Sequence, residues 1–248
     1  MAENGASQKT TSARPELPQG APCWVDAQLP DVEAGKRFYG ELFGWTFDAP
    51  EEETVRARLD GEPVAALVRK TDGRMPTVWS VYFHTPDAAA LAGRIRAGGG
   101  QIVTPPHPVG DQGTTALAAD PDGAVFALWQ PDRHRGFGRR HEPGTFTWAE
   151  LYTRDTEAAN AFYGDLFHDA LFGPDAAPDF GRAPVSSVFP AEMPPHFLVH
   201  FLTGDVEAAL GRVAALGGRV RVPPFETSYG GVAVVSDDQG ASFALLQR

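Results

Sequence analysis

The sequence predicts an α+β protein built from four tandem βαβββ units. Two stretches carry the same pattern, CWVDAQLPDVEAGKRFYGELFGWTF from Cys23 and TWAELYTRDTEAANAFYGDLFHDAL from Thr147. The parallel continues downstream, where MPTVWSVYFHTPD from Met75 matches MPPHFLVHFLTGD from Met193. Within each copy, strand patterns and amphipathic helix patterns follow one another twice. A tandem duplication therefore accounts for nearly the whole chain.

The first unit can be followed element by element. Residues 22–29 alternate as a strand, and Asp31 is a good N-cap for a helix that ends at Gly44. Three short strands are expected around 45–48, 55–59 and 63–70, with a hairpin turn at 59–62.

The next segment repeats this order. A strand begins at Thr77, a helix follows Asp87, and three strands are expected near Ile102, at 114–119 and at 124–130. The second copy is expected to fold in the same way. The domains predicted from this division are 21–130 and 145–248.

Composition narrows the class of protein. The chain has 248 residues, of which 42% are hydrophobic, enough for two domains with their own cores. Residues 1–20 lack the apolar centre of a secretory signal and are expected to form a disordered tail, and no apolar run is long enough to span a membrane. A single cysteine, Cys23, excludes an internal disulfide. We therefore expect a cytoplasmic protein without a membrane partner.

Charge argues against nucleic acid as a partner. The formal net charge is −11, whereas phosphate binding needs a concentrated basic surface. The basic stretch PDRHRGFGRRHEPG at 131–144 lies between the two copies and is expected to be a solvated linker. A small organic ligand is the predicted partner, and the chain is expected to be a monomer or a homodimer.

The motifs resemble a known family. A strand is followed by D-x-x-x-x-x-x-F-Y-x-x-L-F-G from Asp31, and the copy closes with D-P-D-G-x-x-F-x-L-W-Q at 120–130. This pattern resembles the vicinal oxygen chelate superfamily, also called the glyoxalase/bleomycin resistance/dioxygenase family, and especially its two-domain actinobacterial members described as glyoxalase-like or as hydroxylases. The resemblance implies two glyoxalase-like half-barrel domains, each with a concave trough for a ligand. It leaves the function open, because the superfamily includes metal-dependent enzymes and metal-free drug-binding proteins.

The resemblance also implies where metal ligands would stand in metal-using members. In the first domain these positions hold Trp24, Trp79, Ala127 and a residue near Ala66 or Leu67. In the second they hold Trp148, Phe197, Ala244 and a residue near Ser187 or Val188. None of these side chains is a good ligand for a divalent cation. We therefore predict no metal and no cofactor.

Strand alternation identifies the candidate site residues. Trp24, Asp26 and Gln28 share one face of the first strand, and Trp148, Glu150 and Tyr152 share the equivalent face in the second copy. Asp26 and Glu150 are candidate general bases if burial raises their pKa. The other predicted ligand-binding residues are Trp79, Phe83, His107, Trp129, Phe197 and Tyr229.

Three functions remain open at this point. The first is a metal-free protein that binds an aromatic or natural-product ligand in a Trp-lined trough, as antibiotic-resistance members of the superfamily do. The second is a metal-free enzyme, such as an isomerase, cyclase, lyase or hydroxylase-like protein, with Asp26 or Glu150 as base. The third is a structural module whose tryptophans fill the trough. The two troughs are expected to bind differently, or only one of them to bind, because their bordering loops differ.

Overall fold

The computed structural model describes residues 17–49, 54–74, 76–173, 176, 179–190 and 192–248. Most of the predicted N-terminal tail, residues 1–16, lies outside the described residues. Residues 17–20 pack against the protein instead of extending from it. The backbone N–H of Gly20 donates to the carbonyl oxygen of His84 at 2.8 Å, and Leu17 packs against the core.

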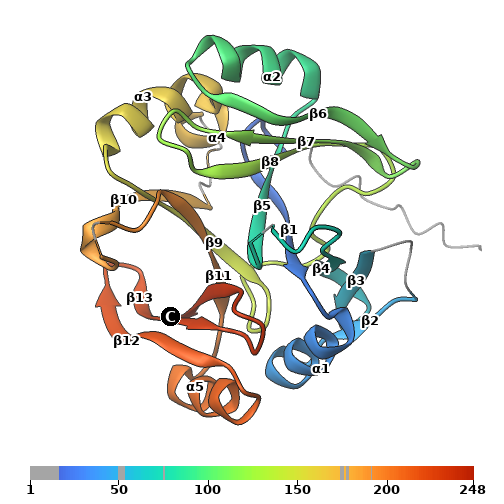
Figure 1. Ribbon diagram of the computed structural model, residues 1–248, viewed down its shortest axis with the longest axis vertical. Coiled ribbons are helices and arrows are strands. Elements are labelled where there is room, and N and C mark those ends of the chain that lie inside the picture. Colours follow the sequence, from blue (N-terminus) through green and yellow to red (C-terminus); the bar gives the residue numbers. More distant parts are fainter. Residues whose placement is uncertain (1–16, 50–53, 75, 174–175, 177–178, 191) are drawn as a thin grey trace, which may run out of the picture.

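The first domain contains two complete βαβββ units that share one sheet (Figure 1). The first unit consists of β1 (Pro22–Leu29), α1 (Val32–Phe43), β2 (Thr46–Phe47), β3 (Thr54–Leu59) and β4 (Glu62–Arg69). The second consists of β5 (Val78–His84), α2 (Ala88–Ala97), β6 (Gln101–Val109), β7 (Gly113–Ala119) and β8 (Val125–Pro131). The strand order is β2-β3-β4-β1-β5-β8-β7-β6, with β1 antiparallel to β5.

The second domain has a six-stranded sheet of order β10-β9-β11-β14-β13-β12. Its first unit contains β9 (Phe146–Thr153), α3 (Thr156–Leu166), α4 (His168–Phe172), β10 (Phe180–Pro184) and a 3₁₀ turn at Val185–Ser187. Its second contains β11 (His196–Leu202), α5 (Val206–Ala215), β12 (Arg219–Thr227), β13 (Gly230–Ser236) and β14 (Ser242–Gln247). The α+β class is confirmed, but among the described residues the third unit is shorter than the predicted βαβββ pattern.

The turns and caps predicted from the sequence form for local reasons. Asp31 accepts a hydrogen bond from the backbone of Ala34, and Asp155 accepts one from Ala158 at the equivalent helix. Gly44 ends α1 in the left-handed conformation at φ 76°, which favours glycine. No helix in the described part of the chain is long and apolar enough to cross a membrane.

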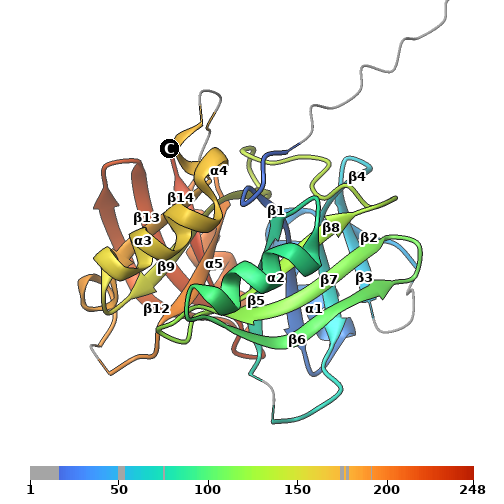
Figure 2. The same cartoon turned by 90° about the horizontal axis from the view of Figure 1, so that it is seen from above.

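The helices of one domain pack against the other domain. Helices α1 and α5 lie together at one end of the interface and α2 and α3 at the other (Figures 1 and 2). The Tyr39 hydroxyl on α1 donates to Asp237 at 2.8 Å, and the Tyr163 hydroxyl on α3 donates to Asp120 at 3.0 Å. Both tyrosines belong to the Phe-Tyr pair that is repeated in the two copies. The pair joins the two domains, with both tyrosines fully buried.

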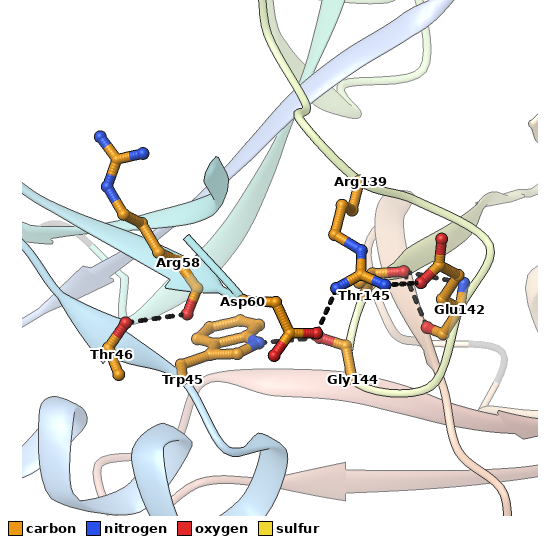
Figure 3. A network of polar contacts seen from close by, with 8 residues as sticks. All are labelled: Trp45, Thr46, Arg58, Asp60, Arg139, Glu142, Gly144 and Thr145. Carbon is orange, nitrogen blue, oxygen red and sulfur yellow. Dashed lines mark hydrogen bonds and ion pairs between the residues drawn. The ribbon is translucent and has the colours of Figure 1, made fainter. Parts of the chain in front are cut away.

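The segment between the domains is not a freely solvated linker as predicted. Phe137 is buried and stacks on Phe146 at 4.8 Å, and its backbone N–H donates to the carbonyl of Cys23 at 2.9 Å. Figure 3 shows a second attachment, in which Arg139 pairs with Asp60 of the β3–β4 turn and with Glu142. The contacts with Cys23 and Asp60 hold this segment against the first domain, and the contact with Phe146 ties it to the second.

The same segment is also tied to the residues that follow α1. The indole nitrogen of Trp45 donates to the carbonyl oxygen of Gly144 at 2.7 Å (Figure 3). Because Trp45 is itself buried, this bond satisfies a polar group that would otherwise cost free energy inside the core.

Candidate functional site

A cavity of about 380 Å³ lies on the concave face of the eight-stranded sheet, which we call the first trough. It is lined by Trp24, Asp26 and Gln28 of β1, so the alternation predicted for this strand places all three side chains together. Trp129 of β8 also lines it. The volume falls within the range of pockets that hold drug-sized molecules.

Asp26 is the central polar group of the first trough and is only 4% exposed. Its carboxylate accepts a hydrogen bond from the Tyr82 hydroxyl at 2.5 Å and one from the Gln28 amide at 3.2 Å. Burial raises the pKa of Asp26 to about 6, while hydrogen bonds from Tyr82, Gln28 and Ser80 partly oppose the increase. The carboxyl group can therefore change protonation state near neutral pH.

His134 joins this cavity from the segment between the domains. Its ring meets Trp24 edge-on at 4.3 Å between centroids, and its carbonyl oxygen accepts from the Trp129 indole at 2.8 Å. The sequence analysis missed this residue because it placed His134 in a solvated linker. The sequence offers no spacing signal for it beyond its position five residues after Trp129.

The opening of the first trough is polar. Arg56 of β3 donates to the Gln112 side chain at 3.3 Å, and Asp111 forms an ion pair with Arg133 at 2.6 Å. Gln112 and Asp111 belong to the β6–β7 turn and line the cavity. His107 of the same hairpin is exposed, bonds to its own backbone neighbour Pro105 and is not part of the cavity lining.

Trp79 and Phe83 do not face the first trough, so their predicted position is wrong. Asp26, which faces the trough, pairs with Ser80 of β5, so Ser80 and Tyr82 two residues later lie on the trough side. Trp79 pairs with Ala27 and lies on the other side of the sheet. The Trp79 indole donates to the Tyr39 hydroxyl at 3.0 Å on the opposite side. Phe83 stacks on Phe167 at 4.9 Å in the core between the domains.

The second trough, on the corresponding face of the six-stranded sheet, holds a similar polar group. Glu150 accepts from the Trp148 indole at 2.6 Å and from the Tyr229 hydroxyl at 3.1 Å. Burial raises the pKa of Glu150, while these two hydrogen bonds and the charge of Arg182 oppose the increase. The structure thus brings two predicted site residues, Trp148 and Tyr229, together around the carboxylate of a third, Glu150.

Apolar packing occupies much of the second trough beside this group. Tyr152 meets Phe189 at 4.9 Å and stacks on His196 at 5.6 Å. The cluster around it includes Val185, Leu198, Val222, Phe225, Val232 and Leu246. Phe197 was predicted to line this trough but lies on the other face, opposite Leu151, and contacts Phe180 at 5.7 Å.

Known proteins of one superfamily are similar to this chain, whose two curled sheets are built from related βα units. A profile of the Glyoxalase/Bleomycin resistance protein/Dioxygenase superfamily matches residues 24–128. "Putative glyoxylase CFP32" of Mycobacterium tuberculosis is 37% identical over 94% of this chain and 97% of its own length. "Anthracycline biosynthesis protein DnrV" of Streptomyces peucetius is 33% identical over 92% of this chain and 93% of its own. The chain therefore belongs to the Glyoxalase/Bleomycin resistance protein/Dioxygenase superfamily.

A solved structure shares the fold across both domains. The Mn(II)-bound glyoxalase from Novosphingobium aromaticivorans matches with a TM-score of 0.63 over 93% of this chain and 83% of that one. Its sequence is only 16% identical, so the likeness concerns the fold alone.

The residues present here do not fit a metal ion of the kind named in that structure. Adjoining strands of the first trough present Trp24, Ala66, Tyr82 and Ala127 on its inner face. Indole and methyl groups offer no lone pair to a divalent cation, and the Tyr82 hydroxyl is engaged with Asp26. Within the described ranges, no group of three or more His, Cys, Asp or Glu side chains is placed to hold a metal ion.

Proposed function

We propose that this protein binds a flat organic molecule in the first trough and does so without a metal ion. The observation that carries the proposal is the Asp26 carboxylate, buried at the bottom of a cavity whose walls include the rings of Trp24 and Trp129. Aromatic walls favour a planar ligand, and one carboxylate orients a hydroxyl group of that ligand. Burying a carboxylate is costly, so its position in an open cavity favours a role in binding over one in packing.

The relatives support a class of ligand. The name of the Streptomyces peucetius relative connects that protein with anthracycline biosynthesis. Anthracyclines contain a planar, oxygenated polycyclic system, and a cavity of about 380 Å³ suits a molecule of this kind. We therefore propose a hydroxylated polycyclic aromatic ligand, held for sequestration or for delivery to another protein.

Native mass spectrometry with parallel elemental analysis tests this proposal. Gently purified protein should carry an organic molecule, or take one up from a panel of hydroxylated polycyclic aromatics, at one per chain and without stoichiometric metal. A stoichiometric transition metal would overturn the metal-free part of the proposal. Failure to bind any member of the panel would overturn the choice of ligand class.

A metal-free enzyme is the second candidate, and the pKa of Asp26 favours it specifically. A carboxylate with a pKa of about 6 is a stronger base than an ordinary aspartate and can remove a proton from an acidic C–H or phenol group. The Tyr82 hydroxyl, which donates to Asp26, would hold the carboxylate in position for this step. Chromatography of the bound molecule before and after incubation separates the candidates, because a binding protein returns its ligand unchanged.

A further inference from the structure

The indole N–H of Trp24 differs from that of every other tryptophan in the chain. Four of the five tryptophans donate this group to a protein oxygen, namely Trp45, Trp79, Trp129 and Trp148. Trp24 lines the first trough and is only 6% exposed, yet its N–H makes no hydrogen bond within the part of the chain that the structure describes. An indole this deeply buried normally finds a partner, so the missing acceptor is expected to come from a ligand.

A molecule in the trough can reach this N–H. In the described ranges, the nitrogens that lack both a partner and accessible surface belong to His134, Arg182 and His200, and Trp24 is not among them. Its nitrogen therefore keeps accessible surface in a residue that borders the cavity. The Trp24 ring is also held in place, by His134 at 4.3 Å and Phe137 at 5.6 Å between centroids. A group that is already oriented loses little conformational entropy when a ligand binds.

The second copy shows what this N–H does when the protein itself supplies the acceptor. The equivalent residues are Trp148 and Glu150, and the Trp148 indole donates directly to the Glu150 carboxylate at 2.6 Å. In the first copy the carboxylate belongs to Asp26, whose side chain is one methylene group shorter. Trp24 and Asp26 thus present a donor and an acceptor on the same face of β1 without a bond between them.

The Asp26 carboxylate has capacity for one more hydrogen bond. One of its oxygens accepts from Gln28 at 3.2 Å and the other from Tyr82 at 2.5 Å. An ionised carboxylate offers about four lone-pair positions, so a ligand can still donate to it. A group placed between Trp24 and Asp26 has to accept from the first and donate to the second. A hydroxyl group does both, whereas a carbonyl or an ether oxygen cannot donate.

We infer that one hydroxyl group of the ligand bridges these two side chains, accepting a hydrogen bond from the Trp24 indole N–H and donating one to the Asp26 carboxylate. The ligand then carries a phenolic or enolic hydroxyl on the edge of its ring system that meets β1. The inference rests on the proposed function and adds the group that selects the ligand. The Trp148–Glu150 bond closes the equivalent position in the second trough, which is not expected to take the same hydroxyl.

Three probes on one ring system test the bridge by calorimetric titration of the full chain at pH 7. 2-Hydroxyanthraquinone can accept and donate at the same atom, 2-methoxyanthraquinone can only accept there, and 9,10-anthraquinone has no group at that position. The hydroxyl probe should bind about tenfold more tightly than anthraquinone, since it gains two hydrogen bonds to buried groups. The methoxy probe should bind no more tightly than anthraquinone.

Replacing Trp24 by 3-benzothienylalanine removes the N–H and keeps the shape and area of the ring. This change should weaken 2-hydroxyanthraquinone about fivefold and leave anthraquinone unchanged, because one hydrogen bond is lost while stacking is retained. The same replacement at Trp148 is the matched control and should alter neither affinity. Trp24→Phe also lacks the N–H and should lower the preference for the hydroxyl probe in the same direction, with its folding checked by urea unfolding.

Hydrogen exchange of the indole protons gives a readout that does not depend on the affinity of a variant. In protein labelled with ¹⁵N-tryptophan, the signal absent from Trp24→Phe identifies Trp24. In the free protein this proton should exchange with solvent faster than that of Trp148, and 2-hydroxyanthraquinone should slow its exchange. Exchange as slow as that of Trp148 in the free protein would show that the group already has a partner and would overturn the inference.

The titrations distinguish two failures. If anthraquinone binds wild type as tightly as 2-hydroxyanthraquinone, or if loss of the Trp24 N–H weakens both equally, the hydroxyl bridge is wrong and the proposed function stands. If none of the three probes binds the wild-type protein, the ligand class of the proposed function and the bridge both fail.

Discussion

Asp26 is expected to make the folded protein less stable at neutral pH. Its pKa is about 6 in the folded state and has an ordinary value of 3.8 when the chain is unfolded. The folded state therefore binds the proton more tightly, and the free energy of unfolding falls as pH rises from about 4 to about 6. This difference corresponds to a cost of about 3 kcal/mol, fully present at pH 7 and absent below about pH 4.

Asp26→Asn removes the charge and keeps an oxygen that can accept from Tyr82. Urea unfolding of both proteins at several pH values measures the effect. The variant should be more stable at pH 7 by up to about 3 kcal/mol, and its advantage should disappear towards pH 4. Glu41→Gln, the same kind of change on an exposed part of α1, should show little difference. A gain for Asp26→Asn that is absent or independent of pH would refute the argument.

Four further experiments test the packing of buried residues. We expect a lower free energy of unfolding, by about 1–3 kcal/mol in urea titrations, for Tyr39→Phe and for Tyr163→Phe. Each change leaves a buried aspartate without one hydrogen bond. Unchanged stability would contradict the role of these tyrosines between the domains. Gly136→Ala should lower the midpoint of thermal unfolding, because Gly136 has φ 93° and an added Cβ would lie 2.3 Å from the carbonyl oxygen of Cys23. The Cys23 thiol, whose pKa is raised by burial, should react with a thiol reagent only as the chain unfolds, and rapid labelling of native protein would show that the residue is accessible.

The sequence was most informative where the two faces of an element differ. In β1, Trp24, Asp26 and Gln28 alternate with small or aliphatic residues, so the period of the strand also showed which side chains share a face. In β5, VWSVYFH, only one face is wholly apolar, and the family resemblance led to Trp79 and Phe83 of that face being assigned to the trough. Ser80 and Tyr82, which carry the polar groups of this strand, were the better guide.

Other features depend on contacts between distant segments. The Phe-Tyr pair and the aspartate of the closing turn each occur in both copies, but their pairing across the domains follows from the way the sheets pack. The shortened third unit coincides with a Pro-rich stretch at 173–195, and proline is poorly accommodated within strands. His134 was missed because the folding of a connecting segment onto the first domain leaves no periodic pattern in the sequence.

The most direct test of the account compares the two equivalent tryptophans. Trp24→Ala and Trp148→Ala are titrated with 2-hydroxyanthraquinone by calorimetry, and the folding of each variant is checked by urea unfolding. The account predicts that Trp24→Ala weakens binding at least tenfold while Trp148→Ala leaves the affinity unchanged, because the ligand stacks in the first trough. Equal affinity in wild type and in folded Trp24→Ala, or a loss confined to Trp148→Ala, would contradict it.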